Sequence, residues 1–525
     1  MVQKLKSLRV DIIIITIILI AGLKFTFGLE KVLDISLYDE SDYLYRGVIL
    51  WKAGFPPAEL APLYSIWYFI ISFLEPNRVM LYFLNYKLTM ILPPIFVYGL
   101  LRKNTVSIPV SLIISLLLLV SYANTIGARV SYFGLIVILV TFILISNKRS
   151  FLLNSLFASM GALLVSYVRP EYFLTYILSA LLFIFLFVRE YRKLEKRYLL
   201  GLLLGFGLTS ALLLGSLEIP INGSRSLSAF GQHFSLNWVS RTGSTINPWT
   251  NWWDILSLNF GSAQSIPETL ANNPSAFLLH VTDNLRNLAP ITARLIFPVN
   301  FFLSRRVVAL LIVCLLITYL TLTRHKRLLM LVEYKELLIF FGLFVIPGLV
   351  SIIIIYPRDH YILLPGVLTI VMMSILLTNH DLEQEQMDYR QLFLIGLLVV
   401  VLTPYFSHNR EEIRRPTLDT IGFIQSLGIH ESVNLLETGG GYNIYLGDNF
   451  HRVAEYSKNT GFNQFRADYG INMIVVSDTL LNDTRFINDP EWQNFLTNYR
   501  QFGYLQKKIA NTNIYLILFA DLLQK

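Results

Sequence analysis

The chain has 525 residues, of which 54% are hydrophobic and only 15% are charged. The apolar residues fall in long uninterrupted runs, which excludes an ordinary soluble globular protein. The formal net charge is +8, but the basic residues form short clusters between apolar runs, where they set membrane topology, so nucleic-acid binding is not indicated. A single cysteine, Cys314, excludes an intramolecular disulfide and a cysteine-based zinc site.

The first apolar run follows Lys4, Lys6 and Arg9, as it would in a secretory signal peptide. No small-residue cleavage site follows before Glu30 and Lys31. We therefore expect a retained first helix with a cytoplasmic N-terminus.

Runs of about 20 apolar residues are long enough to cross a hydrocarbon layer about 30 Å thick. Placing the basic clusters at 102–103, 148–149, 189–197 and 324–327 on the cytoplasmic side predicts about eleven transmembrane helices. They are expected at 11–29, 79–100, 106–122, 130–146, 151–168, 171–188, 198–217, 306–323, 336–356, 361–378 and 391–406. The apolar stretch 289–302 is interpreted as a helix in the outer interface.

This path leaves three long segments outside the cytoplasm: 30–77, 218–304 and the tail 407–525. The tail has a helical pattern at 418–427 and short apolar runs typical of buried strands at 433–436, 471–476 and 514–519. Gly439, Gly440 and Gly441 lack the spacing of a phosphate-binding loop and indicate a tight turn. The predicted fold class is an α-helical polytopic membrane protein, residues 1–406, with a small C-terminal α/β extracytoplasmic domain, residues 407–525.

Three carboxylates crowd the start of the first outer segment: Asp39, Glu40 and Asp42. Like charges this close raise one another's pKa, which is a feature of sites that handle protons or bind a cation. The alternative is a solvated acidic loop end, and spacing alone leaves both open.

The sequence around these carboxylates carries a longer pattern. It reads Asp39-Glu40-x-x-Tyr43, then Gly47, then Gly54-Phe55-Pro56-Pro57 and Pro62-Leu63-Tyr64. This run resembles the first extracytoplasmic loop of the glycosyltransferase C superfamily, multi-pass enzymes that take sugar from a polyprenyl-phosphate carrier, such as protein O-mannosyltransferases and the lipid A aminoarabinose transferase. The resemblance implies that residues 1–406 form a glycosyltransferase domain, that Asp39 acts on the acceptor and that Glu40 is its partner.

A second polar cluster contains Arg358, His360 and Tyr361, between two predicted helices on the outer face. Arg358 could be an interfacial anchor, or its guanidinium could hold a lipid-linked phosphate through paired hydrogen bonds. The run Arg-x-His-Tyr-x-x-x-Pro is similar to a motif of the same superfamily that is associated with the lipid-phosphate site, which favours the second interpretation.

Arg169-Pro170-Glu171 is expected where two further helices meet on the same face. A structural tie between Arg169 and Glu171 and a direct substrate contact both remain open. The motif also resembles members of the superfamily. We place Arg169 with the donor-binding residues, and Glu171, Asp42, Tyr43 and Lys87 in the substrate cavity; Lys87 could instead reach the interface along its aliphatic chain.

The second outer segment contains Trp238, Trp249, Trp252 and Trp253, with His233, Arg241 and Asp254 interspersed. Indole rings could stack on sugars, but tryptophan is also the usual residue of membrane interfaces, and the interface belt is the preferred interpretation.

Together these features predict a glycosyltransferase of the plasma membrane that moves a sugar, with inversion, from a polyprenyl-phosphate donor to a glycan, lipid or protein acceptor outside the cytoplasm. Asp39 would be the general base. Carboxylate oxygens suit Mg²⁺ or Mn²⁺, so Asp39 and Glu40 could also hold a divalent cation. The alternatives are a flippase or transporter of lipid-linked oligosaccharide, with charges along a translocation path, and a surface-polysaccharide polymerase or ligase.

Overall fold

The computed structural model describes residues 2–146, 149–192, 195–221, 225–296, 332–377, 389–405 and 414–523. The predicted helix 306–323 with Cys314, and the basic cluster at 324–327, lie outside the described residues. The chain divides into two compact units. The first contains Met1–Phe25, Phe55–Tyr64 and Tyr86–Pro404, and the second contains Thr26–Gly54, Ser65–Asn85 and Tyr405–Lys525.

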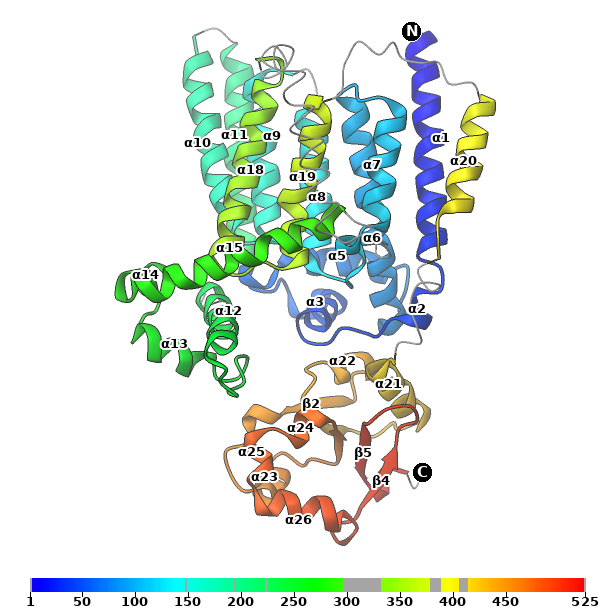
Figure 1. The fold of residues 1–525 in the computed structure, drawn as a ribbon, viewed down its shortest axis with the longest axis vertical. Helices are drawn as coiled ribbons and strands as arrows, with labels where there is room; N and C mark the ends of the chain where they lie inside the picture. Colours follow the sequence, from blue (N-terminus) through cyan, green and yellow to red (C-terminus); the bar gives the residue numbers. More distant parts are fainter. Residues whose placement is uncertain are drawn as a thin grey trace. The chain divides into compact units, whose positions relative to one another are not determined.

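The first unit is built around a bundle of apolar helices, drawn side by side in Figure 1. They are α1 (Val2–Phe25), α6 (Arg78–Lys103), α7 (Ile108–Val120), α8 (Val130–Ile145), α9 (Phe151–Ser166), α10 (Tyr172–Glu190), α11 (Lys196–Leu217), α18 (Lys335–Ile354), α19 (Asp359–Leu377) and α20 (Tyr389–Leu402). Each predicted span that falls on described residues coincides with one of these helices, because long runs without charges favour one continuous element. The predicted fold class is thus confirmed for the bundle.

Within the described residues, six helices are long and apolar enough to cross a membrane. They include α6, α10, α11, α18 and α19, together with the stretch Leu8–Val32. Helices α7, α8, α9 and α20 are shorter apolar helices; α7, with 13 residues, extends over about 20 Å. The chain is therefore a multi-pass membrane protein by helix length and composition, while the count of eleven spans and the orientation stay predictions.

Close packing and one polar tie hold the bundle together. A Cβ atom at Gly161 of α9 would lie 2.2 Å from Oγ1 of Thr141 of α8, so the two helices approach as closely as glycine allows. Asp11 of α1 accepts hydrogen bonds from Tyr98 and Arg102 of α6, each at 2.8 Å. This pair joins the N-terminal part of α1 to the C-terminal end of α6 and compensates both charges.

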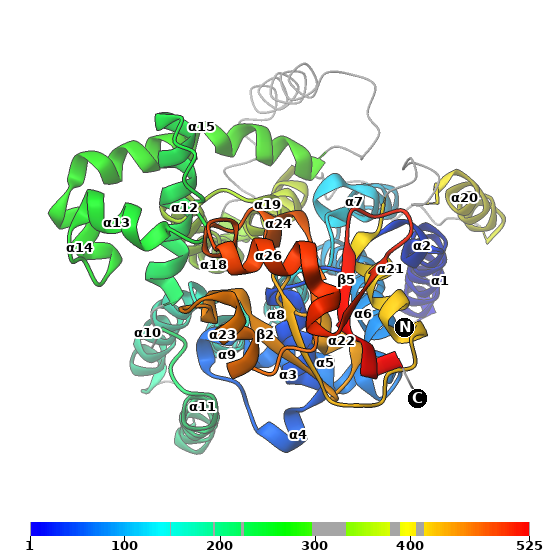
Figure 2. The same ribbon diagram turned by 90° about the horizontal axis from the view of Figure 1, so that it is seen from below.

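The segment predicted as the second outer loop is mostly helical. It contains α12 (Arg225–Thr242), α13 (Trp252–Phe260), α14 (Ile266–Asn272) and α15 (Pro274–Ile296). Phe230, Phe234, Phe260 and Phe277 form a separate small core among them, and Figure 2 shows these helices grouped together. Helix α15 lies crosswise to the bundle in Figure 1 and contacts α18 and α19. Of the predicted interfacial stretch 289–302, the described part belongs to α15.

The second unit contains most of the first outer segment and the C-terminal tail. Its sheet has the order β2-β1-β3-β5-β4, formed by β1 (Val433–Glu437), β2 (Phe450–Ala454), β3 (Met473–Val476), β4 (Tyr504–Lys508) and β5 (Tyr515–Phe519). β1 pairs in parallel with β2 and β3, whereas β5 pairs antiparallel with β3 and β4. The sheet confirms the predicted α/β tail, and β1, β3 and β5 coincide with the three predicted strands.

The remaining elements of this unit surround the sheet or precede it. They are α2 (Leu29–Val32), α3 (Asp39–Val48), α4 (Leu50–Ala53), the main part of α5 (Pro62–Ser72), α21 (Pro416–Ser426), α22 (Tyr442–Leu446), α23 (Phe462–Asp468), α24 (Asp478–Leu481), α25 (Thr484–Ile487) and α26 (Pro490–Asn498). Trp492 is fully buried against Phe462 and Phe495 on one side of the sheet. The predicted helix 418–427 coincides with α21.

The tail and the first outer segment share polar contacts inside this unit. Asp34 accepts hydrogen bonds from the backbone NH groups of Thr417 and Leu418, at 3.0 and 2.8 Å, and so satisfies the start of α21. Arg78 donates to the carbonyl of Ile444 at 2.9 Å and pairs with Asp448 at 2.5 Å. The predicted boundary near residue 406 stays a prediction, since contact grouping joins the tail with residues 26–54 and 65–85.

Candidate active site

The acidic residues of the first outer segment form the first turn of α3. A helix N-terminus favours negative charge, which explains why three carboxylates can begin a helix here. Consecutive helical residues point about 100° apart, and the two carboxylates at the start differ accordingly. Asp39 is exposed, whereas Glu40 is only 1% exposed.

Glu40 is an anchor of α3. Its carboxylate accepts hydrogen bonds from the hydroxyl of Tyr68 on α5 and from the side-chain amide of Asn85 on α6, the latter at 3.3 Å. The amide of Asn85 also donates to the Tyr68 hydroxyl at 2.8 Å. Glu40 is therefore held by two other helices, and the divalent cation considered for Asp39 and Glu40 stays a prediction.

Other residues of the predicted motif serve the packing of α3. Asp42 pairs with Arg46 at 2.7 Å on the same helix, and Tyr43 is buried. A Cβ atom at Gly47 would lie 2.4 Å from Cβ of Tyr68, so this glycine lets α3 and α5 approach closely. Helix α5 begins at Pro62, within the predicted motif. Asp39 is thus the residue of the acidic cluster that a rigid helix presents to solvent.

In the first unit, the structure brings together the two basic motifs that lie almost 190 residues apart. Arg169 follows α9, and its guanidinium lies 4.2 Å from the ring centroid of Tyr361 on α19. It also pairs with Glu171 at 2.5 Å, so the structural tie considered from the sequence is present. Arg358, just before α19, lies 6.0 Å from the same ring and 5.4 Å from that of Trp249.

Two further residues complete this cationic cluster, which we define as Arg129, Arg169, Arg358, His233 and His360. Arg129 precedes α8, and its buried Nε atom has no hydrogen-bond partner among the described residues. Arg129 and Arg169 both act electrostatically on His360. Arg358 and His233 do so as well. Three guanidinium groups therefore act electrostatically on one imidazole.

His233 of α12 is held as a neutral ring. Its Nδ1 atom lies 2.6 Å from the carbonyl oxygen of Ala229, and the ring stacks on Tyr356 at 5.1 Å between centroids. Burial, reinforced by Arg358, lowers the pKa of His233 to about 3. Its buried Nε2 atom lacks a partner within the described part of the chain. This nitrogen and Nε of Arg129 are buried polar atoms to which the described residues supply no hydrogen bond.

Sequence reasoning did not select Arg129, and it assigned the region of His233 and Trp249 to an interface belt. A single arginine before an apolar run was the available signal for Arg129, since a charge at a span end needs a partner. Lys87 lies partly buried in α6 of the first unit, and its assignment to a substrate cavity stays a prediction. Asp39, Glu40, Asp42 and Tyr43 belong to the second unit, and the cationic cluster to the first.

The bundle, the cationic cluster and the α/β tail define a multi-pass membrane protein with a polar, arginine-rich site. No family model matches the sequence, and no curated protein matches it. Among solved structures, the chain is similar to the archaeal oligosaccharyltransferase AglB from Archaeoglobus fulgidus, in complex with an inhibitory peptide and a dolichol-phosphate. The likeness has a TM-score of 0.43 and 13% sequence identity, and it covers 99% of this chain and 74% of that one.

Proposed function

We propose that this protein is a membrane glycosyltransferase that moves a sugar from a polyprenyl-phosphate donor to an acceptor outside the cytoplasm. The observation that carries the proposal is the cationic cluster, in which three arginines gather and only Arg169 is paired with a carboxylate in the described residues. Arg358 contacts aromatic rings and forms no ion pair there. A bound anion stabilises partly buried guanidinium groups that have no carboxylate partner. Phosphate fits them well, because a planar guanidinium group can donate two parallel hydrogen bonds to its oxygen atoms.

In the proposed reaction, the acceptor hydroxyl oxygen attacks the anomeric carbon of the donor sugar. The bond between that carbon and the phosphate oxygen breaks, and the electron pair leaves with the lipid phosphate. Arg358, Arg169 and Arg129 stabilise the negative charge that develops there. Asp39 takes the hydroxyl proton, so attack opposite the leaving group inverts the anomeric centre. No step is routed through a metal ion.

Asp39 and Glu40 have different roles in the proposed enzyme. Asp39 is exposed and can reach a substrate, while Glu40 fixes the helix on which Asp39 stands. A general base needs this combination, because a proton acceptor that is misplaced by about 1 Å can lose about a hundredfold in rate. The resemblance of the first outer segment to the glycosyltransferase C superfamily gives Asp39 the same role.

The test replaces Asp39 with Asn, which keeps the shape and removes the base. Membranes with either protein receive polyprenyl-phosphate sugars labelled in vivo with tritiated monosaccharides, and tritium transferred to non-lipid or lipid acceptors is measured. We expect transfer to fall by about a hundredfold or more. Asp468→Asn, at an exposed position of the same unit, is the matched control and should retain transfer. Full activity of Asp39→Asn would remove the general-base mechanism.

A further inference from the structure

The C-terminal domain places its glycine turn at a position where open α/β sheets commonly bind ligands. β1 lies between β2 and β3, so the carboxyl end of β1 is the point at which the strand order changes direction. Gly439, Gly440 and Gly441 follow β1 directly and lead into α22. In this chain the turn contacts a segment of the protein itself.

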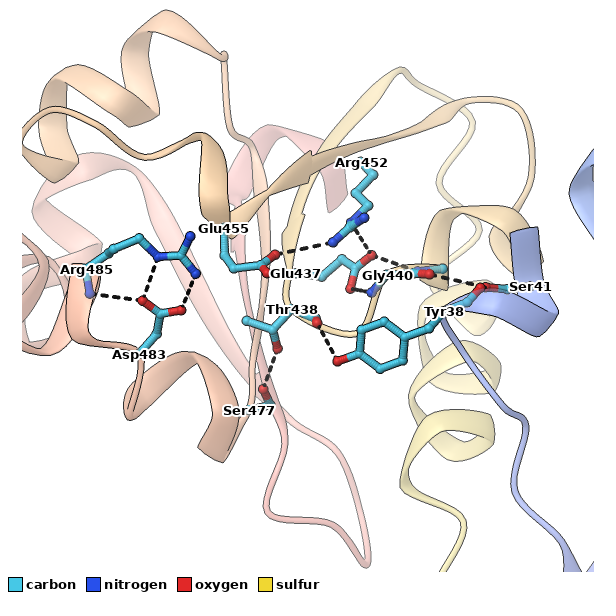
Figure 3. Close-up of polar contacts among 11 residues, drawn as sticks. Tyr38, Ser41, Glu437, Thr438, Gly440, Arg452, Glu455, Ser477, Asp483 and Arg485 are labelled. Atoms are coloured by element: carbon cyan, nitrogen blue, oxygen red, sulfur yellow. Dashed lines mark hydrogen bonds and ion pairs between the residues drawn. The ribbon is translucent and has the colours of Figure 1, made fainter. Parts of the chain in front are cut away.

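The carboxylate of Glu437 organises the turn from inside. Glu437 ends β1 and is fully buried. It accepts hydrogen bonds from the backbone NH groups of Gly440 at 2.7 Å and Gly441 at 3.0 Å, and it pairs with Arg452 of β2 at 3.0 Å. Figure 3 shows this arrangement, in which Arg452 also reaches Glu455. Because these groups satisfy one another, the carbonyl groups of the turn are directed outward to other partners.

The outward partners are the residues on either side of Asp39. The NH group of Tyr38 donates to the carbonyl of Gly440 at 3.2 Å, and the hydroxyl of Tyr38 donates to the carbonyl of Thr438 at 3.0 Å. The hydroxyl of Ser41 lies 3.2 Å from the same Gly440 oxygen. Figure 3 shows Tyr38 and Ser41 against the turn. Tyr38 adopts a positive φ of 62°, a conformation that a tyrosine keeps only when its surroundings hold it.

Glycine is required in the turn because the segment that contains Tyr38 and Ser41 approaches it so closely. A Cβ atom at Gly439 would lie 2.5 Å from Cδ1 of Leu37, and one at Gly441 would lie 2.3 Å from Oγ of Ser41. Gly440 has a φ of +68°, which favours glycine on its own account. The three glycines therefore allow the turn to lie against the residues around Asp39 without a steric clash.

We propose that the turn Gly439–Gly441, with Glu437 beneath it, positions Asp39 for catalysis. Asp39 lies between Tyr38, which the turn holds, and Glu40, which Tyr68 and Asn85 hold. The contacts of the C-terminal domain with Tyr38 thus help to fix the position of α3, the helix that carries Asp39. This inference rests on the proposed function, because it takes Asp39 to be the general base.

The experiment uses the full-length protein in detergent or membranes and compares three variants. Gly441→Ala adds a methyl group against Ser41, and we expect kcat to fall at least about tenfold with the donor KM within about twofold, since binding is retained while the base is displaced. Gly441→Ala combined with Ser41→Gly removes the two Ser41 atoms that lie closest to the methyl group and should restore kcat. Gly422→Ala in α21, where a Cβ atom meets nothing within 4 Å, is the control and should match the wild type.

Thermal unfolding of each variant separates displacement from loss of folded protein. A wild-type kcat in folded Gly441→Ala, a fall in kcat that Ser41→Gly does not reverse, or an equal rise in KM would overturn the inference. If Gly441→Ala does not fold, Tyr38→Phe replaces it: this variant removes the hydrogen bond from the Tyr38 hydroxyl to the carbonyl of Thr438, and an unchanged kcat overturns the inference. An inactive Asp39→Asn beside a fully active Gly441→Ala would reject the positioning role alone, whereas an active Asp39→Asn would reject the proposed function.

Discussion

Asp39 and Glu40 show at the scale of single residues what a sequence pattern can and cannot predict. The acidic pair was recognisable because carboxylates rarely crowd together without a reason. That Asp39 is exposed and Glu40 is buried depends on Tyr68 and Asn85, which belong to two later helices. The spacing of residues within a short stretch of sequence does not identify partners that come from other helices. The same limit applies to Arg129, which acts on His360 together with Arg169 and Arg358, two residues far from it in the sequence.

Arg129 provides a residue-scale prediction. Its partly buried guanidinium leaves Nε without a partner in the described residues, and an uncompensated charge of this kind costs stability. Arg129→Met should therefore keep or raise the unfolding temperature while raising the donor KM by about tenfold or more.

Steady-state kinetics with donor and acceptor varied separately, together with thermal unfolding, check this prediction. Arg286→Met, at an exposed arginine of the same unit, is the control. A large fall in unfolding temperature, or equal effects on donor and acceptor KM, would indicate that Arg129 is a purely structural residue.

At the scale of elements, the predictable parts are those with one continuous signal. The bundle helices contain long apolar runs, and β1, β3 and β5 each contain a short one, whereas the edge strands β2 and β4 mix buried and exposed residues. An edge strand has only one neighbouring strand and tolerates polar residues. Its sequence therefore lacks the apolar run from which a strand is predicted. Helices α12 to α14 were likewise missed, because short amphipathic helices resemble polar loops in a segment rich in Trp, Asn and Ser.

One ion pair joins elements of the C-terminal domain and makes its stability depend on pH. Asp489, before α26, pairs with Lys458 at 2.7 Å and accepts the NH group of Phe462 at 2.9 Å. Burial raises the pKa of Asp489, but the bonds from Lys458 and from backbone NH groups outweigh it and lower the pKa from its usual 3.8. The folded carboxyl thus binds its proton at lower pH than the unfolded one. The stabilisation is present above pH about 4 and is lost as the pH falls through the folded pKa.

We therefore expect hydrogen exchange in β3 to accelerate as the pH is lowered below about 4, after correction for intrinsic exchange rates. Asp489→Asn should destabilise the domain by about 3 kcal/mol at neutral pH, because it leaves Lys458 buried without its partner. Asp468→Asn, which is exposed, serves as the reference. Exchange in Asp489→Asn that equals the wild type at neutral pH would refute this assignment.

At the scale of the whole molecule, composition and basic clusters predicted a helical membrane protein with a C-terminal α/β domain, and both are present. The number of spans and the orientation remain predictions, since helix length alone does not determine them. In the proposed reaction, Asp39 acts on the acceptor hydroxyl and the cationic cluster acts on the phosphate of the donor. A flippase would need the same charges without breaking a glycosidic bond, so bond cleavage separates the two classes.

The most direct measurement follows the lipid product. Membranes from a deletion strain, with or without the wild-type protein, receive polyprenyl-phosphate sugars labelled in both the lipid and the sugar, and extracted lipids and acceptors are quantified over time. The enzyme should release one unglycosylated polyprenyl phosphate for each sugar transferred, with the acceptor linkage inverted. Donor that crosses the membrane intact, with no free polyprenyl phosphate formed, would contradict the account.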